Sequence, residues 1–387
     1  MAGKTRTDHD RAPRPDAAKR IRDLLGPNTK RHVDFKEKLK AHYVVTERDE
    51  RLKVELELML ENLSLRRDDN RPCGDDNRCE GTAVALIAAS GAGKSKALQA
   101  YLKDNPFFPE FGDPAGNCPL ILVGTKSPCT MRNLGMSTLR AAGYPSRTEK
   151  RESEAWPMAH FQMQDSQRLI VGFEEAQRII RQKNVVERAK VIETIAGLMT
   201  DLVWPMHVLL SGLPELSALF QNEFLGEDAS QSERDAHVTL MRRTRFVNFH
   251  PVDLDEDRED LDRGIGEYAK LGGVSLKLLE KAENRARLHH AAARQFGLFW
   301  ELIVLAIDNC VRSGRKVVTI DDFADSYAAR TREPIELNPF ANDHWEFIDT
   351  SIIQHPVDDE PGDKQPVKKP AGKKPAAKKP ERRRDDT

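Results

Sequence analysis

A stretch of small and apolar residues at 82–95 constrains the fold of this chain more than any other segment. Residues 83–88 form an unbroken apolar run of the kind that makes a buried strand, and a helical run begins at Lys96. The loop between them ends in Gly-Lys-Ser and comprises Ser90, Gly91, Ala92, Gly93, Lys94 and Ser95. A strand, a small-residue loop and a helix in this order are typical of a P-loop, or Walker A motif, which binds nucleotide phosphates.

Each residue type in this loop suits phosphate binding. Backbone N–H groups must face phosphate oxygens, glycines allow a close approach, and the following helix N-terminus adds partial positive charge. We expect Lys94 to contact the β- and γ-phosphates of ATP and the Ser95 hydroxyl to hold Mg²⁺. Ala88 stands where the P-loop pattern has its first glycine, and because alanine is also small we expect the loop to form. A chance Gly-Lys-Ser in a turn is the alternative.

The overall composition is that of a globular protein without a membrane segment. The 387 residues are 39% hydrophobic and 32% charged, and no apolar run approaches the ~20 residues of a membrane span. The N-terminus lacks the apolar core of a signal peptide, so we expect a soluble, cytoplasmic protein. Cys73 and Cys79 lie in a polar loop at 66–80, where free thiols are the simpler interpretation and a metal site is the alternative.

Charge is distributed unevenly along the chain. The formal net charge is −1, but residues 364–384 carry ten Lys or Arg and one Glu, a local charge of +9. The rest of the chain therefore sums to about −10 (−1 minus +9). Because this tail repeats Lys-Lys-Pro, we expect it to stay unfolded and to attract a polyanion. A merely solubilising terminus is the alternative.

Apolar runs alternate with helical patterns through the middle of the chain. Beyond the P-loop strand we expect strands at 119–124, 168–173, 206–211 and 244–249. This alternation predicts an α/β fold with a parallel sheet and helices on both faces. Helical patterns cover about 33–65 and most of the chain after 252. The expected domains are a disordered arm at 1–30, a helical region at 31–80, a P-loop core at 81–251, a helical lid at 252–335, a packing segment at 336–357 and a basic tail at 358–387.

Two adjacent acids follow the third expected strand. Glu174 and Glu175 come directly after the apolar run at 168–173. In a P-loop ATPase an acid at this strand end holds Mg²⁺ and the next acid polarises the attacking water, so we assign these roles to Glu174 and Glu175 in that order. Glu174 is one methylene longer than the usual Asp, a departure that bears on hydrolysis more than on binding. An ordinary helix start, where Glu favours the helix dipole, is the alternative.

Three further positions complete the candidate site. Ser211 ends the strand at 206–211 and is our candidate sensor of the γ-phosphate, with a plain strand-ending turn as the alternative. Arg243 belongs to an arginine cluster at 242–245 and is our candidate, ahead of Arg242 and Arg245, for an arginine finger that reaches a neighbouring subunit's ATP, with a solvated basic patch as the alternative. Arg294 precedes an apolar helix and is our candidate lid contact to nucleotide, with an ordinary surface arginine as the alternative.

Taken in order, these motifs resemble the TniB-type transposition ATPases, AAA+ relatives of the TnsC and MuB proteins. The resemblance covers about residues 30–330 and is carried by segments 90–95, 119–124, 127–130, 139–145, 174–177, 209–216 and 242–246. Each motif except the P-loop is weak alone, and their order and spacing make the case. The chain departs from the family pattern at Ala88, Glu174, the loop at 66–80 and the basic tail.

The resemblance implies a P-loop AAA+ three-layer fold with a parallel sheet, followed by a small helical lid domain. It also implies an ATPase that uses ATP and Mg²⁺, forms a homo-oligomer on double-stranded DNA and recruits a DDE-type transposase. We expect contacts mainly to DNA phosphates, because a filament must accept many sequences. Two alternatives stay open. One is another AAA+ ATPase in DNA transactions or defence, and the other is a nucleotide-gated DNA-binding scaffold with negligible turnover.

Overall fold

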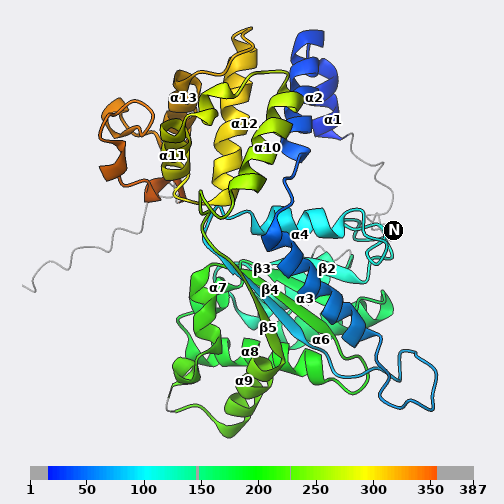
Figure 1. The fold of residues 1–387 in the computed structure, drawn as a ribbon. Coiled ribbons are helices and arrows are strands. Elements are labelled where there is room, and N and C mark those ends of the chain that lie inside the picture. The colour runs from blue at the N-terminus through cyan, green and yellow to red at the C-terminus, as the bar shows by residue number, and fades with distance from the viewer. Residues whose placement is uncertain (1–15, 145–147, 227, 355–387) are drawn as a thin grey trace, which may run out of the picture.

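The structure is a computed structural model that describes residues 16–144, 148–226 and 228–354. Figure 1 shows two parts, a sheet covered by helices and a helical bundle above it. The basic segment at 364–384, for which the sequence predicts an unfolded cationic strand, lies outside the described residues. Within the described ranges, no helix is both long and apolar enough to cross a membrane.

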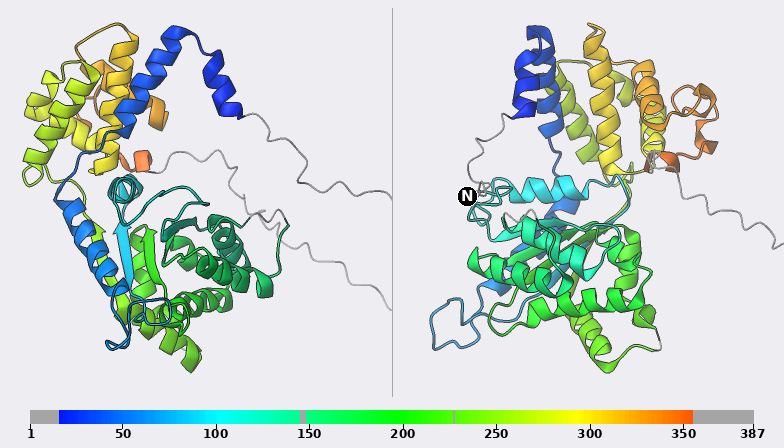
Figure 2. Two further views of the ribbon diagram at one scale, coloured as in Figure 1. Left: turned by 90° about the vertical axis from the view of Figure 1, so that its right-hand side faces the viewer. Right: turned by 180° about the vertical axis from the view of Figure 1, so that it is seen from behind.

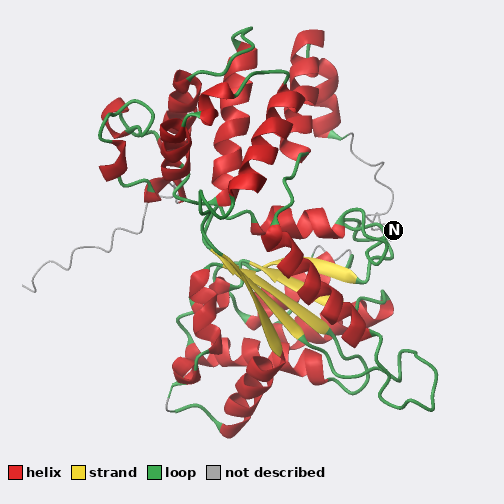
Figure 3. Ribbon diagram, viewed as in Figure 1, coloured by secondary structure: helices red, strands yellow, loops and turns green. Residues whose placement is uncertain are grey.

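The lower part is built on a five-stranded parallel sheet (Figures 1 and 3). Its strands are β1 (Ala83–Ala88), β2 (Leu120–Gly124), β3 (Ile170–Glu174), β4 (His207–Gly212) and β5 (Thr244–Phe249). They lie in the order β2-β3-β4-β1-β5, and every pair of neighbours is parallel. The α/β fold class with a parallel sheet is therefore confirmed, and all five strands form where the sequence predicts them.

Helices cover both faces of the sheet. The helices and 3₁₀ turns of this part are α3 (Glu47–Leu63), α4 (Lys94–Leu102), α5 (Met131–Ala141), α6 (Glu152–Asp165), α7 (Gln177–Ile180), α8 (Val185–Thr200), η2 (Pro214–Phe220), η3 (Asn222–Leu225) and α9 (Gln231–Arg243). Val84 and Leu86 of β1 share a core with α3 and α4. Ala85 and Ile87 share another core with α5, α7 and α8. Successive strand residues point to opposite faces, so the sheet that contains β1 is the middle layer between two layers of helices.

The upper part is a bundle around α12 (Phe296–Arg312). Eleven of the residues of α12 are buried, so this helix is apolar nearly all round, as an enclosed helix must be. Its neighbours are α2 (Pro27–Ala41), α10 (Arg258–Gly272), η4 (Lys277–Glu280), α11 (Ala282–Ala291) and α13 (Ile320–Thr331). We refer to this bundle as the lid, because its first turn at α12 lies on the P-loop.

The helical stretch expected at 33–65 is two helices that belong to different parts of the molecule. Leu39 of α2 is buried in the lid core, whereas Leu52 of α3 packs against the sheet. Figure 2 shows α2 beside the bundle and α3 beside the strands. The break is extended, and Thr46 starts α3 with a capping box to Asp49, which sets the helix boundary. The chain therefore crosses from the lid to the sheet at residues 42–46.

The expected disordered arm at 1–30 is wrong for its last part. The structure has α1 (Ala17–Leu24), and α2 begins at Pro27. The Asp16 carboxylate accepts hydrogen bonds from the N–H groups of Ala18 and Lys19, which caps α1. Arg22 forms an ion pair with Glu37 at 2.6 Å, which joins α1 to α2. Polar composition pointed to disorder, but local capping and a charged pair organise the segment.

The segment after α13 packs back onto the lid. It contains three short 3₁₀ turns, η5 (Ile335–Leu337), η6 (Trp345–Phe347) and η7 (Ser351–Gln354). Phe340 and Ile353 are buried in the lid core. Arg287 of α11 donates to the carbonyl oxygens of Pro339 and Asn342 at 2.9 and 2.7 Å. Hydrogen bonds from the Arg287 side chain to backbone carbonyl oxygens, together with two buried apolar side chains, thus hold a segment that has little regular structure.

Candidate nucleotide-binding site

The P-loop joins β1 to α4, and the side chain of its own lysine folds back onto the loop. Gly91 and Gly93 have φ values of 80° and 94°, in the left-handed region that glycine enters without strain. Gly93 is the N-cap of α4, and Lys94 is the first residue of that helix. The Lys94 Nζ donates to the carbonyl oxygens of Ala88 and Ala89 at 2.8 and 3.1 Å. The loop therefore forms with alanine at 88, and its ammonium group lies across the loop.

Burial alters the chemistry of Lys94. Desolvation lowers the pKa of its ammonium group to about 8, and the nearby Glu175 carboxylate opposes this change. The site therefore holds too little negative charge to keep this lysine at its ordinary pKa. Phosphate oxygens would supply the missing negative charge, so the site is suited to an anion.

Ser95 and Glu174 meet beside the P-loop. Glu174 ends β3, and its carboxyl group accepts a hydrogen bond from the Ser95 side chain. Burial raises the pKa of Glu174, Glu175 raises it further, and the Ser95 hydrogen bond opposes both. Mg²⁺ in nucleotide sites takes only one or two protein oxygens and keeps several waters. The structure thus brings the two predicted metal ligands, Ser95 and Glu174, close together. An exposed serine beside a half-buried carboxyl group fits that ion.

Glu175 follows in a tight turn and its side chain is exposed. Its φ is 57°, in the left-handed region. The hydroxyl of Thr125 lies 2.7 Å from the carbonyl oxygens of both Glu174 and Glu175 and holds this turn against the end of β2. The sequence reasoning missed Thr125. Its only signal was its position as a polar residue directly after an apolar strand.

Strand order places Ser211 near both halves of the site. β4 lies between β1 and β3, so Ser211 is in register with Leu86 of the P-loop strand and with Glu174 of the acidic strand. Ser211 is buried, and its carbonyl oxygen accepts a hydrogen bond from the Ala176 N–H at 2.9 Å. The carboxyl ends of parallel strands share one edge of a sheet, and the candidate polar residues gather there.

The first turn of α12 is seated on the P-loop. The Leu298 N–H donates to the carbonyl oxygen of Gly91 at 3.0 Å. A Cβ at Gly297 would lie 2.5 Å from the same oxygen, so only glycine allows this approach. Arg294 lies three residues before Gly297, is exposed, and has a φ of 60°. The sequence reasoning selected Arg294 but missed Gly297 and Leu298, which make the contact.

Arg243 lies at the opposite edge of the sheet from the P-loop. It ends α9, directly before Thr244, which pairs with Ala83 at the start of β1. Six-residue strands are about 20 Å long, so this arginine does not reach its own nucleotide site. Arg243 forms an ion pair with Glu80. Arg242 is exposed and forms no ion pair with any residue that the structure describes.

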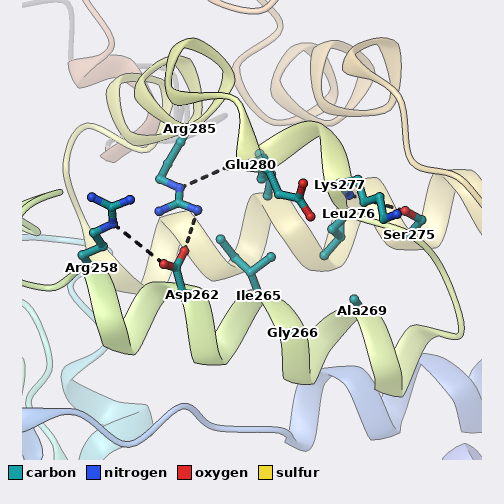
Figure 4. A pocket seen from close by; sticks show the side chains of 11 residues that line it. Arg258, Asp262, Ile265, Gly266, Ala269, Ser275, Leu276, Lys277, Glu280 and Arg285 are labelled. Atoms are coloured by element: carbon teal, nitrogen blue, oxygen red, sulfur yellow. Dashed lines mark hydrogen bonds and ion pairs between the residues drawn. The ribbon is translucent and has the colours of Figure 1, made fainter.

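The cavity in Figure 4 lies in the lid, away from these residues. Its volume is about 580 Å³, and α10 forms one wall while η4 and the start of α11 form the other. Charged groups in its wall already have partners within the protein. Asp262 forms an ion pair with Arg285 at 2.5 Å, and Arg285 also donates a hydrogen bond to the Leu279 carbonyl oxygen at 3.2 Å. In the described ranges, no group of three or more His, Cys, Asp or Glu forms a metal site either. The P-loop residues are therefore the candidate functional site.

Comparison with known proteins supports the fold. No family model matches the chain, and no curated protein matches it. The chain is similar to the solved structure of the Aeropyrum pernix ORC1 protein in complex with DNA, with a TM-score of 0.50 and 12% identity over 76% of this chain and 68% of that one. The chain has the P-loop AAA+ fold.

A second solved structure, Cdc6p from Pyrobaculum aerophilum, has a TM-score of 0.49 and 13% identity, and the match covers 75% of this chain and 69% of that one. At these identities the similarity concerns the fold alone. The fold predicted from the sequence is thus supported by the ORC1 structure. Neither structure is named as a TniB-type protein, so that finer assignment stays a prediction.

Proposed function

We propose that this chain is an AAA+ ATPase that acts on DNA. The observation that carries the proposal is the meeting of Lys94, Ser95 and Glu174 at one edge of the sheet. These residues come from two separate segments of the chain, and a chance Gly-Lys-Ser would have no acidic strand end beside it. The lowered pKa of Lys94 adds support, because it marks a site that lacks an anion.

Each residue has a role in this proposal. The P-loop N–H groups and Lys94 bind the β- and γ-phosphates. Ser95 and Glu174 would hold Mg²⁺, which would neutralise phosphate charge. Glu175 polarises the attacking water and accepts its proton, for which its exposed carboxylate is suited. Ser211 contacts the γ-phosphate from the end of β4. Arg294 contacts the nucleotide from the lid.

The position of the arginine cluster supports assembly into a homo-oligomer. Arg243 lies at the sheet edge opposite its own P-loop, so an arginine finger from 242–245 can act only on a neighbouring subunit. Arg243 must leave Glu80 to do so, whereas Arg242 is already exposed. We propose that ATP binding joins neighbouring subunits through this cluster.

Double-stranded DNA is the proposed partner of the oligomer. The similar ORC1 structure contains DNA, and the segment at 364–384 has a local charge of +9. The order of motifs favours a TniB-type transposition regulator that recruits a DDE-type transposase. Lys and Arg that neutralise DNA phosphates release counterions, so binding should weaken steeply with salt. Removing residues 358–387 should flatten the slope of log affinity against log salt without affecting nucleotide binding.

Phosphate release measured with and without double-stranded DNA tests the proposal. Wild type should release phosphate from ATP, and Glu175→Gln should bind ATP but release little phosphate. A wild type that binds ATP and DNA without measurable release would support the scaffold alternative instead. A wild type that binds no ATP would refute the proposed function.

A further inference from the structure

One buried side chain connects the proposed water-polarising acid to the end of β4. Gln177, the first residue of α7, is 1% exposed. Its Nε2 donates a hydrogen bond to Oε2 of Glu175 at 2.8 Å. Its Oε1 accepts a hydrogen bond from the N–H of Leu213 at 3.1 Å. A single amide therefore bridges the carboxylate and the backbone that follows Ser211.

The surrounding backbone keeps this bridge in place. Gly212 leaves room for the amide, since a Cβ there would lie 2.9 Å from Oε1 of Gln177 and also 2.9 Å from Cδ2 of Leu216. The N–H of Ala176 donates to the Ser211 carbonyl oxygen at 2.9 Å, which fastens the same turn to β4. Within the described ranges, Gln177 is the side chain that hydrogen-bonds the Glu175 carboxylate, and it does so at one of the two oxygens. The second oxygen accepts no hydrogen bond from the described residues.

We propose that Gln177 is a positioning residue that fixes the Glu175 carboxylate relative to the end of β4. This inference rests on the proposed ATPase function. An exposed glutamate has several rotamers, and the Gln177 amide selects the one in which the free carboxylate oxygen is available to a water. A neutral amide suits this position, because a cation there would make the carboxylate a weaker proton acceptor.

The Gln177 bridge also links the position of the Glu175 carboxylate to the position of the β4 end. Because Gln177 holds both Glu175 and Leu213, movement of the β4 end displaces the proton acceptor. Ser211, the proposed γ-phosphate contact, is two residues before Leu213. The state of the γ-phosphate is thereby coupled to the orientation of Glu175.

Substitution of Gln177 tests the proposal. Q177L keeps the size of the side chain and removes both hydrogen bonds, and we expect kcat to fall about tenfold to a hundredfold, as a small misplacement of a catalytic group does. KM and the affinity for a fluorescent ATP analogue should stay within about twofold of wild type, because the P-loop is untouched. Gln182 is the matched control. It donates to the Cys129 carbonyl oxygen at 3.3 Å and does not touch Glu175, so Q182L should keep wild-type kcat.

A double-mutant cycle separates positioning from general loss of structure. If Gln177 acts through Glu175, then Q177L should change the residual single-turnover rate of E175Q by less than about twofold, because residues that act as a unit are not additive. An equal loss in both backgrounds would overturn the proposal, as would wild-type kcat in Q177L.

Gly212→Ala provides a second approach if Q177L unfolds. Its Cβ presses on the amide from β4, so it should lower kcat in the wild-type background and not in E175Q. A wild-type rate in G212A, or the same loss in both backgrounds, would overturn the proposal. A wild type that shows no ATP hydrolysis refutes the proposed function, and this outcome is seen before any variant is made.

Discussion

The contact between the lid and the P-loop can be tested at Gly297. Replacing it with alanine places a Cβ 2.5 Å from the Gly91 carbonyl oxygen and 3.0 Å from the Gly93 nitrogen. Both neighbours are backbone atoms of a tight loop and cannot rotate away. The lid must therefore move, and it then loses the hydrogen bond from Leu298 to Gly91.

The expected cost of this change follows from packing. Inserting a methyl group into a well-packed contact costs about 1–3 kcal/mol. If the cost appears as local opening of the contact, amide exchange of Leu298 should quicken by about fivefold to a hundredfold. The rest of the lid core lies away from the contact and should keep its protection.

Hydrogen exchange of the free protein, read at the Leu298 amide, measures this effect directly. Gly266→Ala is the matched control, because Gly266 is also a lid helix residue and its Cβ would meet nothing within 4 Å. We expect G266A to exchange like wild type at Leu298. If G297A also exchanges like wild type there, the lid is not seated on the P-loop as described, and the reasoning is refuted.

Three further predictions concern pH and assembly. Affinity for an ATP analogue should fall by up to about tenfold per pH unit above pH 8, because Lys94, with a pKa of about 8, loses the charge that binds phosphate; equal affinity at pH 7 and 9 would contradict this. Burial, with a smaller contribution from the nearby Arg78 charge, lowers the pKa of His207 to about 4. Between pH 6.5 and 4 the unfolded chain therefore binds more protons than the folded one. The free energy of unfolding should therefore fall by up to about 3 kcal/mol as the pH drops through that window, and denaturant titrations of His207→Gln should show a shallower dependence. Among R242A, R243A and R245A, at least one should lose turnover while it keeps ATP binding, and light scattering with ATP should show weaker assembly for that variant. Wild-type turnover and assembly in all three would eliminate the arginine finger.

Contiguous features of the sequence predicted much of the fold. Four of the five strands are short and mostly buried, so each appears in the sequence as a largely apolar run. β5 also contains polar residues, and only three of its six residues are buried. The helices α6 and α9 were not predicted. Proline at 157 lies inside α6 and argues against a helix, and α9 is mostly polar with only two buried residues. The capping box of Ser230 and Glu233 was the available signal for α9.

The residues of the candidate site also fall into a group that the sequence predicted and a group that it did not. Lys94 and Ser95 were predictable because the P-loop chemistry is local to one segment. Thr125, Gln177 and Gly297 were not, because each matters through a partner from a distant segment. Thr125 depends on the pairing of β2 with β3, and Gln177 depends on the pairing of β3 with β4. A glycine at 297 is meaningful only once the lid is placed against Gly91.

Nucleotide binding by the Lys94→Ala variant tests the central claim most directly. The matched control is Lys96→Ala, two residues along α4, whose side chain donates to the Lys40 carbonyl oxygen at 3.2 Å. We predict that wild type and K96A bind a fluorescent ATP analogue with similar affinity, and that K94A binds it about tenfold to a hundredfold more weakly, the loss expected for a charged hydrogen bond. Equal binding by wild type and K94A would contradict the assignment of this loop as the nucleotide site.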